Sequence, residues 1–175
     1  MAASGAFSDV AGITSEVTMT DARRVLRDPV HLLAFGFGSG LAPKAPGTFG
    51  TLAVIPLIVA SWWLPFPLAL AAGIALALLS IWICGVSARR LGVHDHPGIV
   101  LDEFAGFYLA MLFAPHDLAW LAGGFVLFRV FDIAKPWPIG WLDRRLQGGL
   151  GIVMDDLVAG LFAGILLLAA QQVSG

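Results

Sequence analysis

The sequence predicts an all-α integral membrane protein, a helical bundle of about five short spans with peripheral or re-entrant helices. Of the 175 residues, 58% are hydrophobic and only 13% are charged. Soluble domains usually contain about 45–50% apolar residues, and the mean hydropathy here is +0.86. The apolar residues also fall into long runs that short proline, glycine and charged segments separate. A chain of this length corresponds to about one domain.

Charge and cysteine content narrow the possible functions. The net charge of −2 gives no basis for a nucleic-acid partner. The single cysteine, Cys84, excludes an intrachain disulfide. Residues 1–28 are polar and show no secretory signal peptide. We interpret them as a tail leading into a short interfacial helix from Asp21 to Asp28, and we expect residues 29–175 to form the membrane-embedded domain.

The first apolar segment and the loop after it are predicted to lie at the membrane surface. His31 to Ala42 is too short to span a bilayer, so an interfacial or re-entrant segment is expected. The following Pro/Gly loop opens onto an apolar helix. Gly47, Thr48 and Gly50 would expose backbone N–H groups at that helix N-terminus, a setting that favours a phosphate. A plain helix-entry turn explains these residues equally well.

Five apolar runs are predicted to cross the membrane, and short turns join them. The last run contains Gly160 and Gly164, a small-xxx-small pair suited to close helix packing. A short amphipathic segment, Ile139–Leu146, precedes the last run. The five predicted spans are Thr51–Leu64, Leu68–Ala88, Phe104–Ala114, Leu118–Ile133 and Leu150–Gln171.

The basic residues predict the orientation. With the N-terminus in the cytoplasm and the spans threaded alternately, all ten Lys and Arg fall on the cytoplasmic side. The opposite turns, Pro65–Pro67 and Ala114–Leu118, contain none. Every polar cluster described below falls on the same face. A site built from these clusters would therefore open to the cytoplasm.

The stretch from His94 to Phe104 is the most polar part of the apolar region. It contains two imidazoles and the carboxylates of Asp95, Asp102 and Glu103. An unpaired acidic residue at a membrane helix centre costs roughly 2.5–3.5 kcal/mol, and less near the interface. A divalent cation is the simplest compensation. Alternatively, Asp102 and Glu103 simply occupy the first helical turn, which the helix dipole favours.

Two further groups repeat this pattern. Arg129, Asp132 and Lys135 follow each other at three-residue spacing, which predicts that they share one side of a helix. Carboxylates from three helices would form an oxygen-rich site for Mg²⁺. Arg129 and Lys135 would add the positive charge that phosphoryl transfer needs. Alternatively, both cations only neutralise Asp132. The remaining acids of these groups are Asp143, Asp155 and Asp156.

Other candidate groups are less informative. His94 and His96 could bind metal or carry a proton, but local hydrogen bonding is the commoner role of such histidines. Trp137 and Trp141 are expected to anchor the membrane interface. Cys84 and Arg89 have one residue too few between them for a cysteine-phosphatase loop, and no Asp-x-Asp pair is present. Metal-assisted attack remains, with water or a carboxylate as the nucleophile.

Seven motifs in order resemble the phosphatidylglycerophosphatase A family, and the similarity runs from about Pro29 to Leu168. The resemblance implies a Mg²⁺-dependent enzyme of the bacterial cytoplasmic membrane that removes the terminal phosphate of phosphatidylglycerophosphate to give phosphatidylglycerol. It also implies an active site containing Asp102, Glu103, Asp132, Lys135, Asp143, Asp155 and Asp156. The motifs are Gly36-Phe-Gly-Ser-Gly40, Pro46-Gly-Thr48, Gly92-Val-His-Asp-His96, Asp102-Glu-Phe104, Phe128-Arg-Val-Phe-Asp132, Lys135-Pro-Trp-Pro-Ile139 and Gly151-Ile-Val-Met-Asp-Asp156.

The predicted function is therefore a Mg²⁺-dependent lipid phosphate monoesterase that acts on a phospholipid in the membrane. A small ion or proton transporter is the alternative, but the outer halves of the predicted spans contain almost no polar groups for a pathway. The predicted roles are catalytic for Asp95, Asp102, Glu103, Asp132, Lys135 and Asp143, phosphate-binding for Gly47, Thr48, Arg129 and Lys135, and metal-binding for Asp102, Glu103, Asp132, Asp155 and Asp156.

Overall fold

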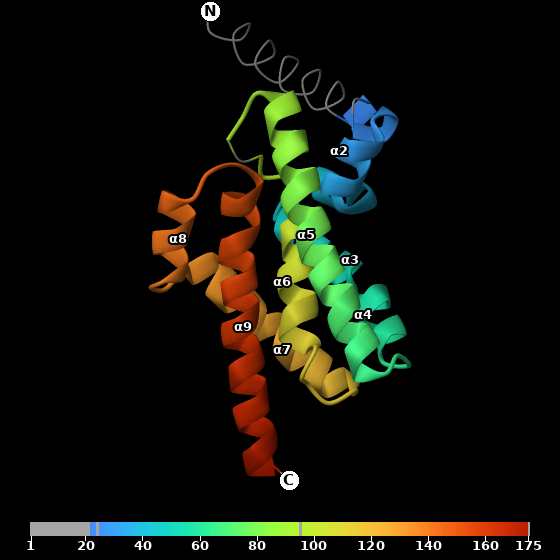
Figure 1. Ribbon diagram of the computed structural model, residues 1–175, viewed down its shortest axis with the longest axis vertical. Coiled ribbons are helices and arrows are strands. Elements are labelled where there is room, and N and C mark those ends of the chain that lie inside the picture. Colours follow the sequence, from blue (N-terminus) through green and yellow to red (C-terminus); the bar gives the residue numbers. More distant parts are fainter. Residues whose placement is uncertain (1–21, 24, 95, 175) are drawn as a thin grey trace, which may run out of the picture.

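The computed structural model describes residues 22–23, 25–94 and 96–174, and their regular structure is entirely helical (Figure 1). This confirms the all-α prediction. The predicted polar tail, including Asp21 at the start of the expected interfacial helix, lies outside the described residues apart from its last few positions. The helices are α2 (Pro29–Ala34), the 3₁₀ helix η1 (Gly36–Leu41), α3 (Pro46–Ala53), α4 (Ile55–Ser61), α5 (Phe66–Leu91), α6 (Leu101–Met111), α7 (Leu118–Ala134), α8 (Ile139–Arg145) and α9 (Gly148–Ser174).

Helix α6 lies at the centre of the bundle, between α5 and α9 (Figure 1). Ten of its eleven residues are buried. Two side-chain hydrogen bonds fix it against α5: Ser80 Oγ donates to the Leu101 carbonyl over 3.0 Å, and Tyr108 Oη donates to the Ala69 carbonyl over 3.0 Å. Because these bonds hold both ends of α6, the polar first turn of this helix has a fixed position in the bundle.

Glycines allow α6 and α9 to pack with their backbones in contact. A Cβ atom on Gly160 would collide with the Gly106 carbonyl oxygen, and one on Gly164 would lie 3.3 Å from the Ala110 carbonyl oxygen. A Cβ on Gly106 would lie 2.6 Å from the Asp156 carbonyl oxygen. The predicted close packing at Gly160 and Gly164 is therefore confirmed, with α6 as the partner helix.

The structure supports only part of the prediction of about five spans. By length and composition, two described helices could cross a membrane, Phe66–Leu91 and Gly148–Val173. Helix α6 has eleven residues and rises only about 16 Å, roughly half of a hydrocarbon core. Helix α7, with 17 residues, is also shorter than the usual span of about 20. The bundle therefore combines two long helices with shorter ones packed beside them.

The predicted first span, Thr51–Leu64, is wrong as a single helix because Pro56 divides it. Helix α3 ends at Ala53, and α4 starts at Ile55 with Pro56 in its first turn. Proline has no N–H to continue the helix ladder, so it is tolerated in a first turn and breaks a helix interior. The segment predicted to be interfacial or re-entrant, His31–Ala42, forms α2 and η1. His31 is buried there, and its Nδ1 lies 2.8 Å from Ser87 Oγ of α5.

Candidate active site

A polar cavity of about 330 Å³, which we call the acidic cavity, lies beside the first turn of α6 and the second and third turns of α9. Six carboxylates and the ammonium of Lys135 line it, together with two imidazoles. The predicted acidic groups from three parts of the sequence thus meet at one place. The lining residues are His94, His96, Pro97, Ile99, Asp102, Glu103, Asp132, Lys135, Asp143, Gly151, Ile152, Asp155 and Asp156.

Asp102 and Glu103 form the centre of the cavity wall. Both are only 9% exposed, because they belong to the buried first turn of α6. Asp102 Oδ1 accepts a 3.0 Å hydrogen bond from the Glu103 backbone N–H. This helix start also presents a positive dipole end, which favours negative charge. The helix dipole therefore favours the charges of Asp102 and Glu103, as the sequence suggested. It does not explain why further acidic side chains lie beside these two residues.

Asp156 joins Asp102 and Glu103 from α9. The close approach of Gly106, in the second turn of α6, to the Asp156 backbone brings the third turn of α9 against α6. Oxygen atoms of Asp102, Glu103 and Asp156 lie within 4.8 Å of one another. Three carboxylates so close together repel each other unless protons or cations are bound.

The donors of this cluster fit a hard divalent cation. All three residues offer carboxylate oxygens, which Mg²⁺ and Ca²⁺ prefer. Glu103 Oε2 is buried and forms no hydrogen bond with any described residue. A buried charged oxygen without a partner is costly, and a cation would supply the missing interaction. The cluster is therefore a candidate metal site.

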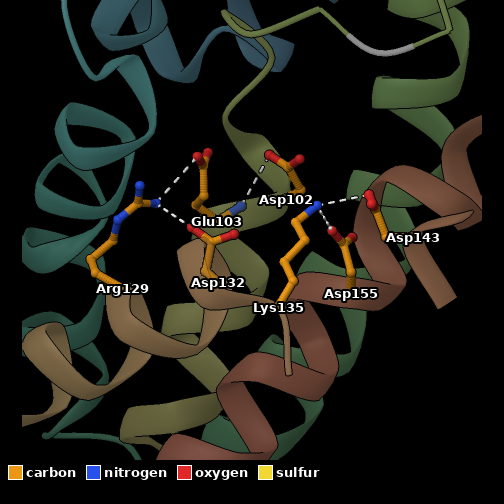
Figure 2. Close-up of polar contacts among 7 residues, drawn as sticks. All are labelled: Asp102, Glu103, Arg129, Asp132, Lys135, Asp143 and Asp155. Carbon is orange, nitrogen blue, oxygen red and sulfur yellow. Dashed lines mark hydrogen bonds and ion pairs between the residues drawn. The ribbon is translucent and has the colours of Figure 1, made fainter. Parts of the chain in front are cut away.

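Arg129 of α7 flanks the cluster on one side (Figure 2). Its Nη1 lies 2.6 Å from Asp132 Oδ2 and 3.6 Å from Glu103 Oε1. These contacts are ion pairs rather than well-aligned hydrogen bonds, and the buried Nε forms no hydrogen bond within the described part of the chain. The predicted spacing of Arg129 and Asp132 on one helix face is confirmed.

Lys135 flanks the cluster on the other side, and here the predicted geometry is wrong. Helix α7 ends at Ala134, and Lys135 adopts a left-handed conformation with φ of 42°. Its Nζ donates 2.7 Å hydrogen bonds to Asp143 Oδ1 and Asp155 Oδ2 rather than to Asp132 (Figure 2). Burial opposes the charged form, but the two hydrogen-bonded carboxylates outweigh it and raise the pKa of Lys135 above its usual value. The Lys135 side chain is therefore positively charged at neutral pH.

Comparison with known proteins identifies the family. Residues 32–171 match the model of phosphatidylglycerophosphatase A. The chain belongs to this family. It is 47% identical over 146 residues to a phosphatidylglycerophosphatase A of Escherichia coli (strain K12), covering 82% of this chain and 85% of the relative. It is 42% identical over 149 residues to the phosphatidylglycerophosphatase A of Haemophilus influenzae (strain ATCC 51907 / DSM 11121 / KW20 / Rd), covering 83% and 91%.

A relative with a different name extends the comparison. A putative phosphatidylinositol-3-phosphatase of Bacteroides thetaiotaomicron (strain ATCC 29148 / DSM 2079 / JCM 5827 / CCUG 10774 / NCTC 10582 / VPI-5482 / E50) is 36% identical over 152 residues, covering 82% of this chain and 94% of the relative. No solved structure matches the chain. The resemblance found in the sequence and the prediction of a phosphatase are thus confirmed, which disfavours the transporter alternative.

Two of the residues predicted to bind phosphate, Gly47 and Thr48, do not line the cavity. Gly47 and Thr48 are in the first turn of α3, outside the cavity lining. The Thr48 N–H donates to the Ala45 carbonyl over 2.9 Å, so it is not directed at a ligand. A Cβ on Gly47 would collide with Glu103 Oε1. Gly47 therefore allows α3 to pack directly on Glu103, while its role in binding phosphate stays a prediction.

The loop before α6 is only partly described. Asp95, predicted to be catalytic, lies outside the described residues. His96 Nδ1 accepts a 3.0 Å hydrogen bond from the Gly98 N–H, which is the local role that the sequence favoured. The sequence interpretation missed the structural importance of Gly106, which brings Asp156 to the cluster. The signal was present, because Gly106 is a small residue inside an apolar helix.

Proposed function

We propose that the chain hydrolyses phosphatidylglycerophosphate to phosphatidylglycerol and phosphate, with Mg²⁺ bound by Asp102, Glu103 and Asp156. The observation that carries this proposal is the three-carboxylate cluster in a cavity that Lys135 also lines, in a member of this family. The predicted ligand roles of Asp132 and Asp155 stay predictions. Their ion pairs with Arg129 and Lys135 make a positioning role the simpler interpretation.

The charge of the cavity supports the need for a cation. Six carboxylates line the cavity and one lysine opposes them. A phosphate monoester is itself anionic, so this cavity would repel it unless further positive charge is present. A bound Mg²⁺ would supply that charge and would polarise the phosphoryl oxygens or activate a water molecule.

The two cations near the cavity, Lys135 and Arg129, have different roles in this proposal. The Lys135 ammonium lines the cavity and carries the positive charge that the equatorial phosphoryl oxygens need. Asp143 and Asp155 hold that ammonium in place through two hydrogen bonds. Arg129 neutralises Asp132 and Glu103 behind the cavity wall. Either water or a carboxylate attacks the phosphorus.

The activity test compares phosphate release from phosphatidylglycerophosphate by detergent-purified protein with and without Mg²⁺. Asp102→Asn and Asp156→Asn should each lower turnover at least a hundredfold, about 2.7 kcal/mol, because each removes one ligand charge at similar volume. Asp117→Asn is the matched control. Asp117 caps the N-terminal end of α7, away from the cavity, and asparagine caps a helix equally well. Near-normal turnover in both site variants at saturating Mg²⁺ would refute the metal site.

The same assay tests the substrate. Phosphatidylinositol 3-phosphate is the comparison lipid, because the Bacteroides relative is named for it. We expect faster release from phosphatidylglycerophosphate. A clear preference for the inositol lipid would leave the phosphatase assignment intact and replace the proposed substrate.

We also propose a multi-pass arrangement of about five membrane-embedded helices in the bacterial cytoplasmic membrane, with the cavity facing the cytoplasm. Two helices of sufficient length and the clustering of basic residues support it. A cysteine at the exposed Val93 should react with an impermeant thiol reagent only from the cytoplasmic side, and one at Leu118 only from outside. The native Cys84 is buried and should stay unlabelled. The reverse pattern would overturn the orientation.

A further inference from the structure

A second cavity, of about 200 Å³, lies between α5 and α6 and is lined almost entirely by apolar side chains. Gly73 and Ala77 of α5 line one side of it, and Ala105, Tyr108 and Leu109 of α6 line the other. Ile74 also lines it and is 54% exposed, so the cavity reaches the outer surface of the helix pair. We call it the apolar groove. Its walls offer neither charge nor a catalytic group.

On two separate helices, residues that line the apolar groove stand close along the chain to residues that line the acidic cavity. On α6, Asp102 lines the acidic cavity, and Ala105, three residues later and so on the same side of the helix, lines the apolar groove. On α9, Asp156 lines the acidic cavity and the next residue, Leu157, lines the apolar groove. Along α6 the two linings are therefore less than one helical turn apart.

A hydrogen bond and a close contact hold one wall of the groove in place. Tyr108 forms one wall, and the hydrogen bond from its hydroxyl to the Ala69 carbonyl holds the ring in place. Gly73 faces that ring, and a Cβ there would lie 3.0 Å from Tyr108 Cε1. Along α6 the groove extends from Ala105 to Leu112, which corresponds to about 10 Å. A narrow apolar channel of this length fits an extended hydrocarbon chain better than a headgroup.

We propose that the apolar groove holds one acyl chain of the phospholipid substrate while its phosphate lies at the carboxylate cluster. This inference rests on the proposed function and adds how the substrate is recognised. An acyl chain leaves one apolar medium for another when it moves from bilayer to groove, so the groove gains little affinity from the hydrophobic effect. Its contribution is orientation, because a fixed chain positions the attached phosphate for attack.

The test compares two substrates with the same headgroup, dioleoyl and dihexanoyl phosphatidylglycerophosphate, in one detergent. Ala77→Phe places a ring in the groove, and Leu78→Phe places the same ring on the neighbouring, 63% exposed position of α5 that does not line it. We expect Ala77→Phe to lower the long-chain to short-chain ratio of kcat/KM at least tenfold, with the short-chain value within twofold of wild type. Leu78→Phe should change neither value. An unchanged ratio in folded Ala77→Phe protein would overturn the proposal.

A second measurement on the wild-type protein covers the case in which Ala77→Phe does not fold. A phosphatidylglycerophosphate with a diazirine at the end of one acyl chain is irradiated with the protein, and the adducts are mapped by mass spectrometry. We expect adducts on residues 70–77 and 105–112, and fewer with a phosphatidylethanolamine probe that carries the same chain. Equal labelling by both probes would mean that the groove holds bulk lipid, which overturns the inference. Absence of phosphate release from either substrate by wild type would instead refute the proposed function.

Discussion

Arg129 and Lys135 lie on opposite sides of Glu103 and Asp132, yet the two cations are held in different ways (Figure 2). Arg129 projects from within α7, and its side chain is 14% exposed. Lys135 follows the end of α7, and its side chain is 33% exposed. Arg129 is paired with Glu103 and Asp132, whereas Lys135 is hydrogen-bonded to Asp143 and Asp155.

The difference supports the proposed division of roles, in which Lys135 contacts the ligand and Arg129 is structural, while the predicted phosphate-binding role of Arg129 stays a prediction. Lys135 lines the acidic cavity, and Arg129 does not. Arg129 lies beside the carboxylates of Glu103 and Asp132, whose side chains are only 12% and 14% exposed. Without Arg129, these two buried charges would lose their ion-pair partner. Removing one partner of a buried ion pair costs far more than the pair itself contributes. The two residues should therefore respond differently to the same substitution.

Arg129→Met is expected to have the largest effect, and on stability. The change leaves Glu103 and Asp132 buried without their cation, and such a loss costs about 3–5 kcal/mol. Thermal or denaturant unfolding in detergent measures it. The double variant with Asp132→Leu should recover part of the loss, because one of the unpaired charges is then gone. An Arg129→Met protein of normal stability but without turnover would instead place Arg129 at the substrate.

Lys135→Met is expected to act on turnover. Removing a preorganised donor to a transition-state oxyanion costs about 3 kcal/mol, so the rate of phosphate release should fall at least a hundredfold. Lys135→Arg should restore part of the rate, because it keeps the charge on a bulkier, planar group. The exposed Lys44 provides the matched control, Lys44→Met, which should leave the rate unchanged.

Stability distinguishes the alternatives for Lys135. A melting temperature close to that of wild type with lost turnover supports contact with phosphate. If Lys135→Met unfolds the protein and Asp155→Leu restores the fold, Lys135 is a structural cation like Arg129. The partner in this test is Asp155, which the structure places against Lys135, rather than the Asp132 that helical spacing predicted.

The contrast also shows how far the sequence could predict this site. Three-residue spacing correctly placed Arg129 beside Asp132, because both lie within one continuous helix. It failed at Lys135, because the helix ends at Ala134, just before the Pro136–Pro138 turn, and the chain changes direction. Local rules therefore hold only as long as the element continues.

Rules based on local sequence spacing do not predict which helices contact each other. The sequence identified Gly160 and Gly164 as a packing face but did not pair them with their partners on α6, which are Gly106 for Gly160 and Ala110 for Gly164. The contact at Gly106 decides that Asp156 rather than Asp155 reaches Asp102 and Glu103. Similarly, the apolar runs predicted where helices lie, while Pro56 in the first run was the overlooked signal for a break.

Asp143→Asn should have the smallest effect and tests how firmly Lys135 is held. Asp143 has a side chain that is 39% exposed, so its ion pair with Lys135 contributes only about 0.2–1 kcal/mol. Asp155 remains hydrogen-bonded to the ammonium after the change. The pKa of Lys135 should then move down towards the usual value of about 10.4, which still leaves the group charged at neutral pH. We therefore expect turnover at pH 7 to fall less than about tenfold, with an unchanged pH–rate profile below about pH 9. Initial rates of phosphate release between pH 6 and pH 10 measure both quantities.

A hundredfold loss at pH 7 with normal stability and saturating Mg²⁺ would show that Asp143 takes part in the chemistry itself, as the sequence predicted, rather than only positioning Lys135.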